Sequence, residues 1–341
     1  MHKKEIELTN YLKSALVFPK EIHLESSSRC NSSCLTCPRD KMQRELGEMS
    51  REIFVKAVNE TANYDMDYIM LHLNGEPLLL DIDELVWRIN YARDTNPKCK
   101  QINFFTNGSL LTPEIIDKLL LSKLDLIMIS IDGGNQEDYE KIRRGLSWKT
   151  LVNNVYNLVK RKKELKSNLY IQTAIVPQVA NQNSVRTYFS IFSTIGVDHV
   201  AGSGVNNIGG LIDADNMKLS TQRNDIKAIN LPCFKIFLDL DICSDGRALI
   251  CSQDVVGALP IGDLKTQTLQ EIWQGFIISE IREKFMSGRK QEIPFCGKCD
   301  FMTGFVYPEW WDISQEDWTL AYDTAVNDII KDLCKRLRLP I

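Results

Sequence analysis

The sequence predicts an α/β fold, a partial (β/α)6 barrel followed by a small α+β domain, and three observations carry this prediction. The chain has 341 residues, of which 44% are hydrophobic, so it can bury a large core. Up to about residue 204, short β-rich runs alternate with longer amphipathic segments, which is typical of βα units around a parallel sheet. This alternation ends after Gly210, which indicates that a second, smaller unit begins there.

The predicted strands are short runs rich in Ile, Leu and Met, as expected for strands that are buried on both faces. The six strands span residues 21–28, 68–74, 101–106, 125–132, 169–176 and 199–203. Helices that coat the outside of the sheet are expected at residues 50–64, 82–93, 113–121 and 148–163. Ser50 and Thr112 are placed as caps of two of them. This order predicts a TIM-like barrel, or part of one.

The region after the barrel has a different pattern. Residues 213–230 are polar, and residues 234–251 are typical of a hairpin whose turn lies at residues 244–246. A single amphipathic helix is expected over residues 268–284. The predicted limits are an N-terminal extension at 1–20, the barrel at 21–212, the small domain at 231–305, and an aromatic tail with a C-terminal helix at 306–341.

Composition and charge argue against several classes of function. The 41 Lys and Arg residues face 45 Asp and Glu, and a formal net charge of −4 offers little basis for binding nucleic acid or an anionic membrane. No apolar run approaches the roughly 18 residues of a membrane span, and residues 1–20 lack the apolar centre of a secretory signal. We therefore expect a cytoplasmic protein with no nucleic-acid or membrane partner.

The ten cysteines carry most of the chemical information in the sequence. Disulfide frameworks belong to small secreted chains, so metal ligation is the better explanation here. Cys30, Cys34 and Cys37 form a C-x₃-C-x₂-C run after the first predicted strand, at the strand end where barrels hold active sites. Three thiolates are one short of a closed zinc or [4Fe–4S] site, so one iron would stay open to a small molecule. A zinc ribbon or three unrelated thiols is the alternative.

This cysteine run resembles the CxxxCxxC motif of radical S-adenosylmethionine (SAM) enzymes. In that family the motif holds a [4Fe–4S] cluster whose open iron chelates SAM, which is cleaved to methionine and a 5′-deoxyadenosyl radical. The segment after the second strand, Asn74-Gly75-Glu76-Pro77, resembles the family's GGEP segment, which receives the SAM amino group. Asn74 replaces the first glycine of that segment.

Later segments continue the resemblance to a SAM site. The turn at residues 106–108 resembles the family's TNG turn, and the segments at 130–133 and 139–143 resemble those that meet the SAM ribose and carboxylate. Thr36 stands where many members have an aromatic residue beside the adenine. The SAM contacts implied by the resemblance are Asn74, Gly75, Glu76, Asn107, Ser130 and Arg143. Each short motif alone also fits a turn glycine, a loop cap or a solvated charge.

The second cysteine group is Cys233, Cys251, Cys296 and Cys299. Twelve residues separate Cys233 from Gly246, and four separate Gly246 from Cys251. This C-x₉₋₁₅-G-x₄-C and C-x₂-C spacing resembles the auxiliary-cluster domain called SPASM, or twitch in its short form. The resemblance implies one auxiliary [4Fe–4S] cluster, closed by four thiolates, that passes electrons and does not bind SAM. A four-cysteine zinc site would use the same ligands.

Cys243 lies inside the predicted hairpin, which is expected to face the barrel mouth. A thiol there could donate a hydrogen atom to a substrate radical, so Cys243 is a candidate catalytic residue. A buried small hydrophobe is the alternative. Candidates for a proton acceptor lie on or near strand ends, namely His72, Glu25, Asp132 and His199.

The leading functional hypothesis is a radical SAM oxidoreductase that oxidises an alcohol of a sugar-like or aminocyclitol-like small molecule to a ketone. The second electron would pass to the auxiliary cluster, and an external reductant such as flavodoxin or ferredoxin is an expected partner. The alternatives are an epimerase that uses Cys243, a maturase of a ribosomal peptide, and a non-catalytic electron-transfer protein. Only 29 residues precede Cys30, which disfavours the leader-binding domain that many maturases carry.

Overall fold

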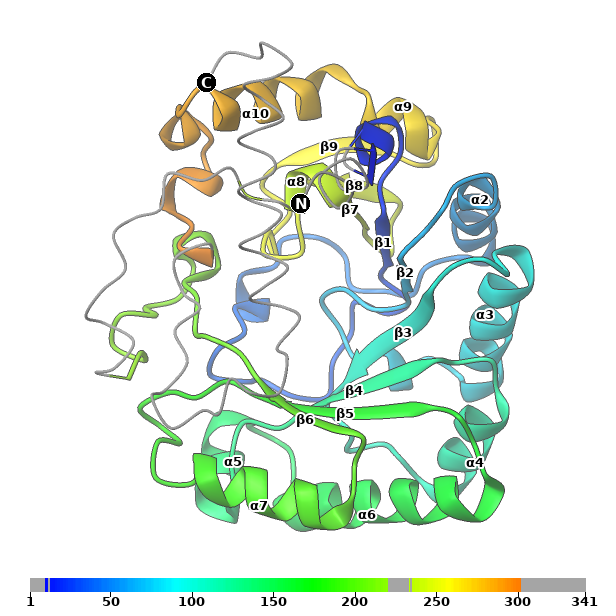
Figure 1. Ribbon diagram of the computed structural model, residues 1–341. Helices are drawn as coiled ribbons and strands as arrows, with labels where there is room; N and C mark the ends of the chain where they lie inside the picture. The colour runs from blue at the N-terminus through cyan, green and yellow to red at the C-terminus, as the bar shows by residue number, and fades with distance from the viewer. Residues whose placement is uncertain (1–9, 12, 220–232, 234, 302–341) are drawn as a thin grey trace.

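The structure is a computed structural model that describes residues 10–301, except residues 12, 220–232 and 234. The predicted aromatic tail and C-terminal helix, at 306–341, lie outside the described residues. Within the described part of the chain, one nine-stranded sheet has the order β6-β5-β4-β3-β2-β1-β7-β8-β9. The whole fold is organised around this sheet (Figure 1).

The first six strands are parallel and form the partial barrel, as predicted. They are β1 (Glu21–Leu24), β2 (Tyr68–Met70), β3 (Gln101–Thr106), β4 (Leu126–Ser130), β5 (Tyr170–Ile175) and β6 (His199–Gly202). Each lies inside its predicted range. Several end earlier than predicted because the last residues of the range leave the sheet to form the loops of the site.

Helices cover the outer face of the barrel strands (Figure 1). Four confirm the predicted helices, namely α2 (Arg51–Thr61), α3 (Ile82–Thr95), α4 (Pro113–Leu121) and α6 (Trp148–Leu165). The predicted caps are confirmed, since the side chains of Ser50 and Thr112 accept hydrogen bonds from backbone amides of α2 and α4. Two further helices were not predicted, α5 (Gln136–Ile142) and α7 (Val185–Ile195).

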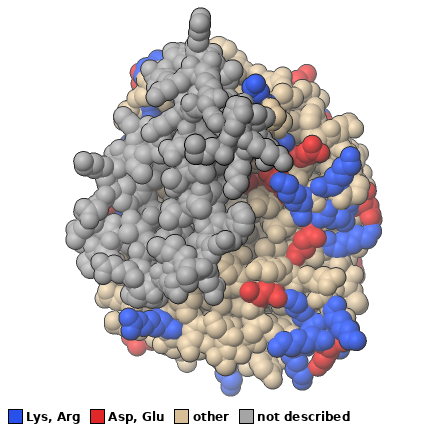
Figure 2. Space-filling model, viewed as in Figure 1, with Lys and Arg blue, Asp and Glu red and all other residues tan. Residues whose placement is uncertain are grey.

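The exposed surface of these helices carries charges of both signs. Arg51 of α2 pairs with Glu84 of α3, and Lys118 of α4 pairs with Asp83 of α3. Figure 2 shows blue and red side chains interspersed along the edge where these helices run. The basic side chains named here therefore face acidic partners on a neighbouring helix. Among the described helices, none is both long and apolar enough to cross a lipid bilayer.

The small unit continues the barrel sheet. Strand β7 (Asp239–Ile242) pairs in parallel with β1, and β8 (Arg247–Leu249) and β9 (Pro260–Asp263) follow as antiparallel strands. The predicted turn of the hairpin is confirmed, because Gly246 has φ +91° and the Cys243 amide donates to the Arg247 carbonyl oxygen at 2.8 Å. The short helix α8 (Lys235–Leu238) precedes this hairpin.

The prediction of one helix over residues 268–284 is wrong, because the structure has two, α9 (Leu269–Trp273) and α10 (Phe276–Met286). The break lies at Gly275, whose backbone is extended and which caps α10. Trp273 of α9 is fully buried, and its indole donates to the Ala15 carbonyl oxygen at 2.7 Å. One hydrophobic core therefore includes the small unit, the barrel and part of the predicted N-terminal extension.

Candidate active site

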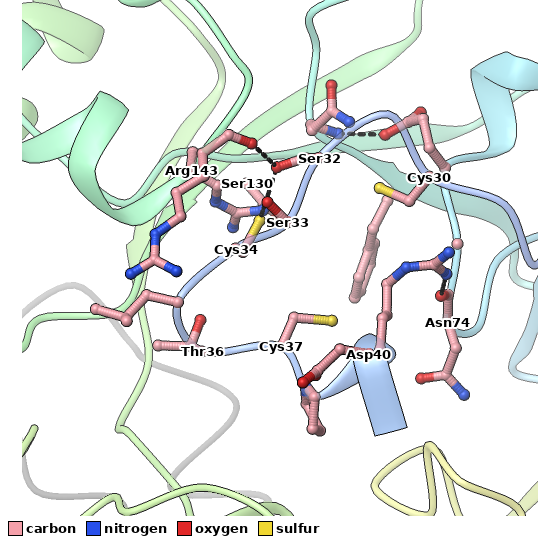
Figure 3. A pocket seen from close by; sticks show the side chains of 18 of the residues that line it. Cys30, Ser32, Ser33, Cys34, Thr36, Cys37, Asp40, Asn74, Ser130 and Arg143 are labelled. Atoms are coloured by element: carbon pink, nitrogen blue, oxygen red, sulfur yellow. Dashed lines mark hydrogen bonds between the residues drawn. The ribbon is translucent and has the colours of Figure 1, made fainter. Parts of the chain in front are cut away.

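A cavity of about 730 Å³ lies at the C-terminal ends of the barrel strands. Cys30, Cys34 and Cys37 line it from the loop after β1 (Figure 3). The predicted SAM contacts line the same cavity, namely Asn74, Gly75, Glu76, Asn107, Ser130 and Arg143. The structure thus brings together residues that the sequence places after four different strands. No fourth cysteine is found among the described residues that line this cavity.

The three cysteines suit a cluster better than a single zinc ion. Zinc–sulfur bonds of about 2.3 Å place the sulfurs of a tetrahedral site about 3.8 Å apart. In the described part of the chain, the sulfurs of Cys30, Cys34 and Cys37 do not all lie within 4.8 Å of one another. A four-iron cluster is larger and needs the wider spacing. Burial, and then the neighbouring Cys34, raise the pKa of Cys37 to about 11, so a positively charged metal group is needed to hold the thiolate.

Hydrogen bonds from two sides hold the cysteine loop in place. The Leu35 amide donates to the Ile142 carbonyl oxygen at 2.8 Å. On the other side, Nη1 of Arg39 donates to the carbonyl oxygens of Ser28 and Asn74, each at 2.5 Å. Arg39 was not predicted as a site residue, and the sequence offers no signal for it because both of its acceptors are backbone atoms.

Gly75 and Glu76 join the ends of three barrel strands. A Cβ atom on Gly75 would lie 1.9 Å from the Ser27 carbonyl oxygen, so only glycine allows this approach. The Glu76 carboxylate accepts hydrogen bonds from the Asn107 amide and from Oγ1 of Thr106, both at 2.7 Å. Burial raises the pKa of Glu76, and these hydrogen bonds oppose that shift. Glu76 therefore faces the cavity and also fixes the turn after β3.

Asn107 connects that turn to the cysteine loop. Its Nδ2 donates to Oδ1 of Asn31 at 2.8 Å, and its Oδ1 accepts a hydrogen bond from the Ser109 amide at 2.9 Å. Asn31 directly follows Cys30 in the sequence. The neighbouring Gly108 has φ +73°, which is the positive value expected of a turn glycine. The side chain of Asn107 thus positions the loop that carries the first cysteine.

Arg143 places a positive charge at the cavity wall (Figure 3). Its Nη2 lies 2.7 Å from Oδ2 of Asp132, and its Nη1 lies 3.7 Å from Sγ of Cys34. Although burial opposes the charge, Asp132 raises the pKa of Arg143 above its ordinary value. Asp132 also accepts a hydrogen bond from the Val176 amide, so both of its oxygens are engaged. A fixed guanidinium of this kind suits a carboxylate ligand.

The second cysteine group gathers in the small unit. Burial, and more weakly the neighbouring Cys299, raise the pKa of Cys233 to about 12. Burial and then Cys233 raise the pKa of Cys296 to about 12 as well. Burial, followed by Asp241 and Cys233, raises the pKa of Cys251 well above its usual value. These mutual effects require the thiols to be neighbours, and among the described residues no three of their sulfurs lie within the 4.8 Å that a single ion needs.

A second cavity, of about 850 Å³, shares a wall with the first. The shared wall includes Cys37, His72 and Phe105. Its lining also includes Ser252 and Gln253, which directly follow Cys251 of the second cysteine group. The second cavity therefore borders both cysteine regions and is next to the cavity of the predicted SAM contacts.

His72 lines both cavities. Its Nε2 lies 3.1 Å from the Gly75 carbonyl oxygen, and because a carbonyl only accepts, Nε2 carries the proton. Burial lowers the pKa of His72 to about 4, so the ring is neutral at pH 7 and Nδ1 keeps a free lone pair. His72 therefore combines the position and the protonation state of a proton acceptor.

The other candidates for a proton acceptor are placed differently. Glu25 is fully buried, pairs with Arg44 and accepts a hydrogen bond from the Ser244 amide at 2.9 Å. Asp132 holds Arg143, as described above. His199 begins the edge strand β6 and lines neither cavity. Among the four candidates, His72 alone lines the two cavities described here.

Cys243 is not brought to either cavity. Its side chain is 0% exposed and packs in a small cluster with Leu73 and Leu249. Burial raises the pKa of its thiol. The position matches the alternative of a buried small hydrophobe, and the role of Cys243 as a hydrogen donor stays a prediction.

The chain is similar to curated proteins along different parts of its length. It is 30% identical over 127 residues to the AdoMet-dependent heme synthase of Methanosarcina barkeri, which covers 37% of this chain and 34% of that protein. It is 20% identical over 281 residues to the S-adenosyl-L-methionine-dependent 2-deoxy-scyllo-inosamine dehydrogenase of Niallia circulans, covering 82% and 92%. For the heme synthase and two further relatives, the match spans only 31% to 38% of the relative's length.

Solved structures share the fold at low sequence identity. BtrN in complex with AdoMet and 2-DOIA has a TM-score of 0.56 at 18% identity, covering 82% of this chain and 92% of that one. Native anSMEcpe with bound AdoMet has a TM-score of 0.57 at 17% identity, covering 94% and 97%. SuiB bound to its precursor peptide SuiA has a TM-score of 0.61 at 13% identity, covering 82% and 70%. At these identities the likeness establishes the fold alone.

Two family models match the chain at the two cysteine groups. The model of the Radical SAM superfamily matches residues 24–173, and the SPASM model, an iron–sulfur cluster-binding domain, matches residues 233–300. The cofactors are accordingly SAM, the [4Fe–4S] cluster that binds it, and auxiliary iron–sulfur in the small unit. The chain belongs to the radical SAM superfamily and carries a C-terminal SPASM domain.

Proposed function

We propose that the chain is a radical SAM oxidoreductase that dehydrogenates an alcohol carbon of a sugar-like or aminocyclitol-like small molecule. The observation that carries this proposal is the second cavity, which has Cys37 and His72 in one wall and the neighbours of Cys251 in another. Its volume of about 850 Å³ is in the range of small-molecule pockets. The similarity to 2-deoxy-scyllo-inosamine dehydrogenase over 82% of this chain supports the substrate class.

Oxidation of an alcohol to a ketone removes a hydrogen atom from carbon, a proton from oxygen and one further electron. When SAM and the clusters are bound, SAM supplies the radical that takes the hydrogen atom, and the auxiliary cluster supplies an acceptor for the electron. The proton must go to a side chain or to water. The protein's own tasks are therefore to bind SAM, to place the substrate between the two cysteine groups, and to accept this proton.

The SAM cavity offers charges that complement an amino acid zwitterion. Arg143 presents a fixed positive charge, held by Asp132, to a carboxylate. Glu76 presents a carboxylate to an ammonium group while its hydrogen bonds to the backbone keep it in place. Arg39 and Asn31 keep the cysteine loop against these residues. Together these side chains bind and orient SAM next to the shared wall.

His72 is the proposed proton acceptor. Its Nδ1 is unprotonated because Nε2 donates to the Gly75 carbonyl oxygen. The ring lines the proposed substrate cavity, and burial keeps it neutral until the substrate is bound. A hydroxyl group within hydrogen-bond reach of Nδ1 could pass its proton there as the ketone forms.

The proposed auxiliary ligands are Cys233, Cys251, Cys296 and Cys299. Cys251 leads directly into Ser252 and Gln253 of the cavity wall, so an electron acceptor held there is adjacent to the proposed substrate. An external reductant such as flavodoxin or ferredoxin completes the proposed cycle.

The experiment is anaerobic reconstitution with iron and sulfide, followed by incubation with SAM, a reductant and a panel of cyclitols, aminocyclitols and sugars. A dehydrogenase gives a product that has lost two hydrogens, with one 5′-deoxyadenosine formed per product. Cys251→Ala should retain SAM cleavage and lose ketone formation. Cys243→Ala should keep forming ketone. A product of unchanged mass, or modification of a peptide only, would overturn the proposal.

A further inference from the structure

We propose that Glu21, His23 and Asp239 form a site for one divalent first-row transition-metal ion, separate from both cysteine groups. Glu21 and His23 lie on β1, and Asp239 lies directly opposite Glu21 on the paired strand β7. One possible ligand atom from each residue lies within 4.8 Å of the other two. The parallel register of two strands therefore brings an imidazole and two carboxylates to one point.

Two of the possible ligand atoms are buried and lack hydrogen bonds. His23 is 5% exposed and Asp239 is 2% exposed. Nε2 of His23 and Oδ1 of Asp239 have no hydrogen-bond partner, although Oδ2 of Asp239 pairs with Lys235 at 2.5 Å. Buried polar atoms without partners cost free energy, so native proteins rarely leave them unsatisfied. Two such atoms, on residues whose possible ligand atoms gather within 4.8 Å, indicate that a ligand lies among them.

Asp241 supports the histidine from the other side. Its Oδ1 lies 2.5 Å from Nδ1 of His23, and its side chain is fully buried. A carboxylate at one ring nitrogen is the usual support of a metal-binding histidine, since it fixes the orientation of the ring. The other nitrogen, Nε2, lies 3.9 Å from Oε2 of Glu21. An ion with bonds of about 2.1 Å to each ligand fits across that distance.

Charge and ligand type select the kind of ion. Three carboxylates, those of Glu21, Asp239 and Asp241, lie around His23, and Lys235 pairs with Asp239, so a dication would balance the remaining negative charge. One imidazole with two carboxylates suits Mn²⁺, Fe²⁺ or Zn²⁺ better than Ca²⁺ or Mg²⁺, which prefer oxygen ligands alone.

The site faces the second cavity, because Glu21 and His23 line its wall. Three protein ligands leave coordination positions open, and a hydroxyl oxygen of a bound molecule could take one of them. This last step rests on the proposed function, whereas binding of the ion does not.

The first test uses Mn²⁺ as the probe on cluster-loaded protein that has been passed over a chelating resin. With the clusters oxidised and EPR-silent, the six-line signal of free Mn²⁺ reports binding. The wild type should bind one equivalent, and Glu21→Gln should weaken binding by about tenfold or more. Asp67→Asn is the matched control, because Asp67 lines the same cavity but pairs with Lys100 outside the cluster.

The second test identifies the ligand directly. Pulsed EPR of the bound Mn²⁺ should show modulation from an imidazole nitrogen, and His23→Gln should remove it. This readout in the wild type decides the question even if a variant loses its clusters. The proposal would be overturned if the wild type does not bind Mn²⁺ stoichiometrically below about 1 mM, or if Glu21→Gln and His23→Gln bind it as well as the wild type does. Neither measurement needs turnover, so failure of the proposed dehydrogenation leaves this test valid.

Discussion

At the scale of single residues, the absence of one side chain lets two loops of the site touch. A Cβ atom on Gly75 would lie 1.9 Å from the Ser27 carbonyl oxygen and 2.8 Å from that of Arg29. Backbone atoms cannot move aside as the end of a long side chain can. The close contact between the GGEP-like segment and the cysteine loop therefore depends on glycine at this position.

We predict that Gly75→Ala lowers stability by about 1–3 kcal/mol and reduces cluster content, since the loops must separate. Thermal unfolding and iron analysis measure these effects. Gly47→Ala is the matched control, because a Cβ atom there meets nothing within 4 Å. Equal behaviour of the two variants would show that the contact at Gly75 is not needed.

Glu76→Gln tests the charge at the SAM cavity. The amide keeps the size of the side chain but loses the negative charge that we propose faces the SAM ammonium. SAM affinity should fall by about tenfold, or about 1.4 kcal/mol, and equilibrium dialysis with cluster-loaded protein measures it. Unchanged affinity would restrict Glu76 to its structural hydrogen bonds with Thr106 and Asn107.

His72 gives stability a defined pH dependence. Burial lowers its pKa from 6.5 to about 4 in the folded chain, so between these values the unfolded chain binds the additional proton. Stability should therefore decrease as the pH falls from about 6.5 towards 4, by up to about 3 kcal/mol from this residue. Denaturant unfolding at several pH values, at equal cluster loading, should show a smaller decrease for His72→Asn. An identical slope in the variant would contradict the buried, neutral ring.

The gathering of the three predicted cluster cysteines and the six predicted SAM contacts around one cavity was predictable, because their spacing is local and resembles known motifs. Arg39 was not predictable, because it donates only to backbone carbonyl oxygens and any chain offers those. The contact of His23 with Asp241 could not be predicted either, since it depends on the pairing of two strands that lie far apart in the sequence.

At the scale of elements, the helices that were missed have weak sequence signals. Helix α5 has only seven residues, most of them polar, with Tyr139 and Ile142 buried. Helix α7 is rich in β-branched and aromatic residues, which individually favour strands, and Ser184 makes no side-chain cap. Both helices form because the barrel buries their apolar side chains, and that is a tertiary effect.

The cysteine loop is an element whose position depends on Arg39. Arg39→Gln removes the charge and weakens two hydrogen bonds to backbone carbonyl oxygens, so we expect a loss of about 1.5–3 kcal/mol. Hydrogen exchange should increase in residues 28–41 before other regions are affected. Arg289→Gln is the control, since Arg289 is exposed and its ion pairs contribute about 1 kcal/mol or less. Equal exchange in the two variants would show that Arg39 does not hold the loop.

At the scale of the whole molecule, the sheet crosses the predicted domain limit. The change of pattern after Gly210 suggested a separate small domain, but β7 pairs with β1 and both contribute to one hydrophobic core. The sequence shows where the βα repeats end. It does not show which strand the next one joins, because that depends on contacts between distant segments.

We therefore predict that the barrel and the SPASM unit unfold together. Leu240 of β7 is fully buried in the shared core, and Leu240→Ala should cost about 2–5 kcal/mol. Far-UV circular dichroism and cluster absorbance should change in one coincident transition, in the wild type and in the variant. Two separate transitions would show that the units are independent despite the common sheet.

Strand β1 pairs with β2 on one side and with β7 on the other through the same residues, with Glu21 opposite both Tyr68 and Asp239. An insertion of one residue into β1 would turn its side chains over against both neighbours at once. Insertions and deletions should therefore be tolerated far better in the loops than in this strand. A mutant library that seeks new substrates should diversify the wall after Cys251 and leave residues 21–24 untouched.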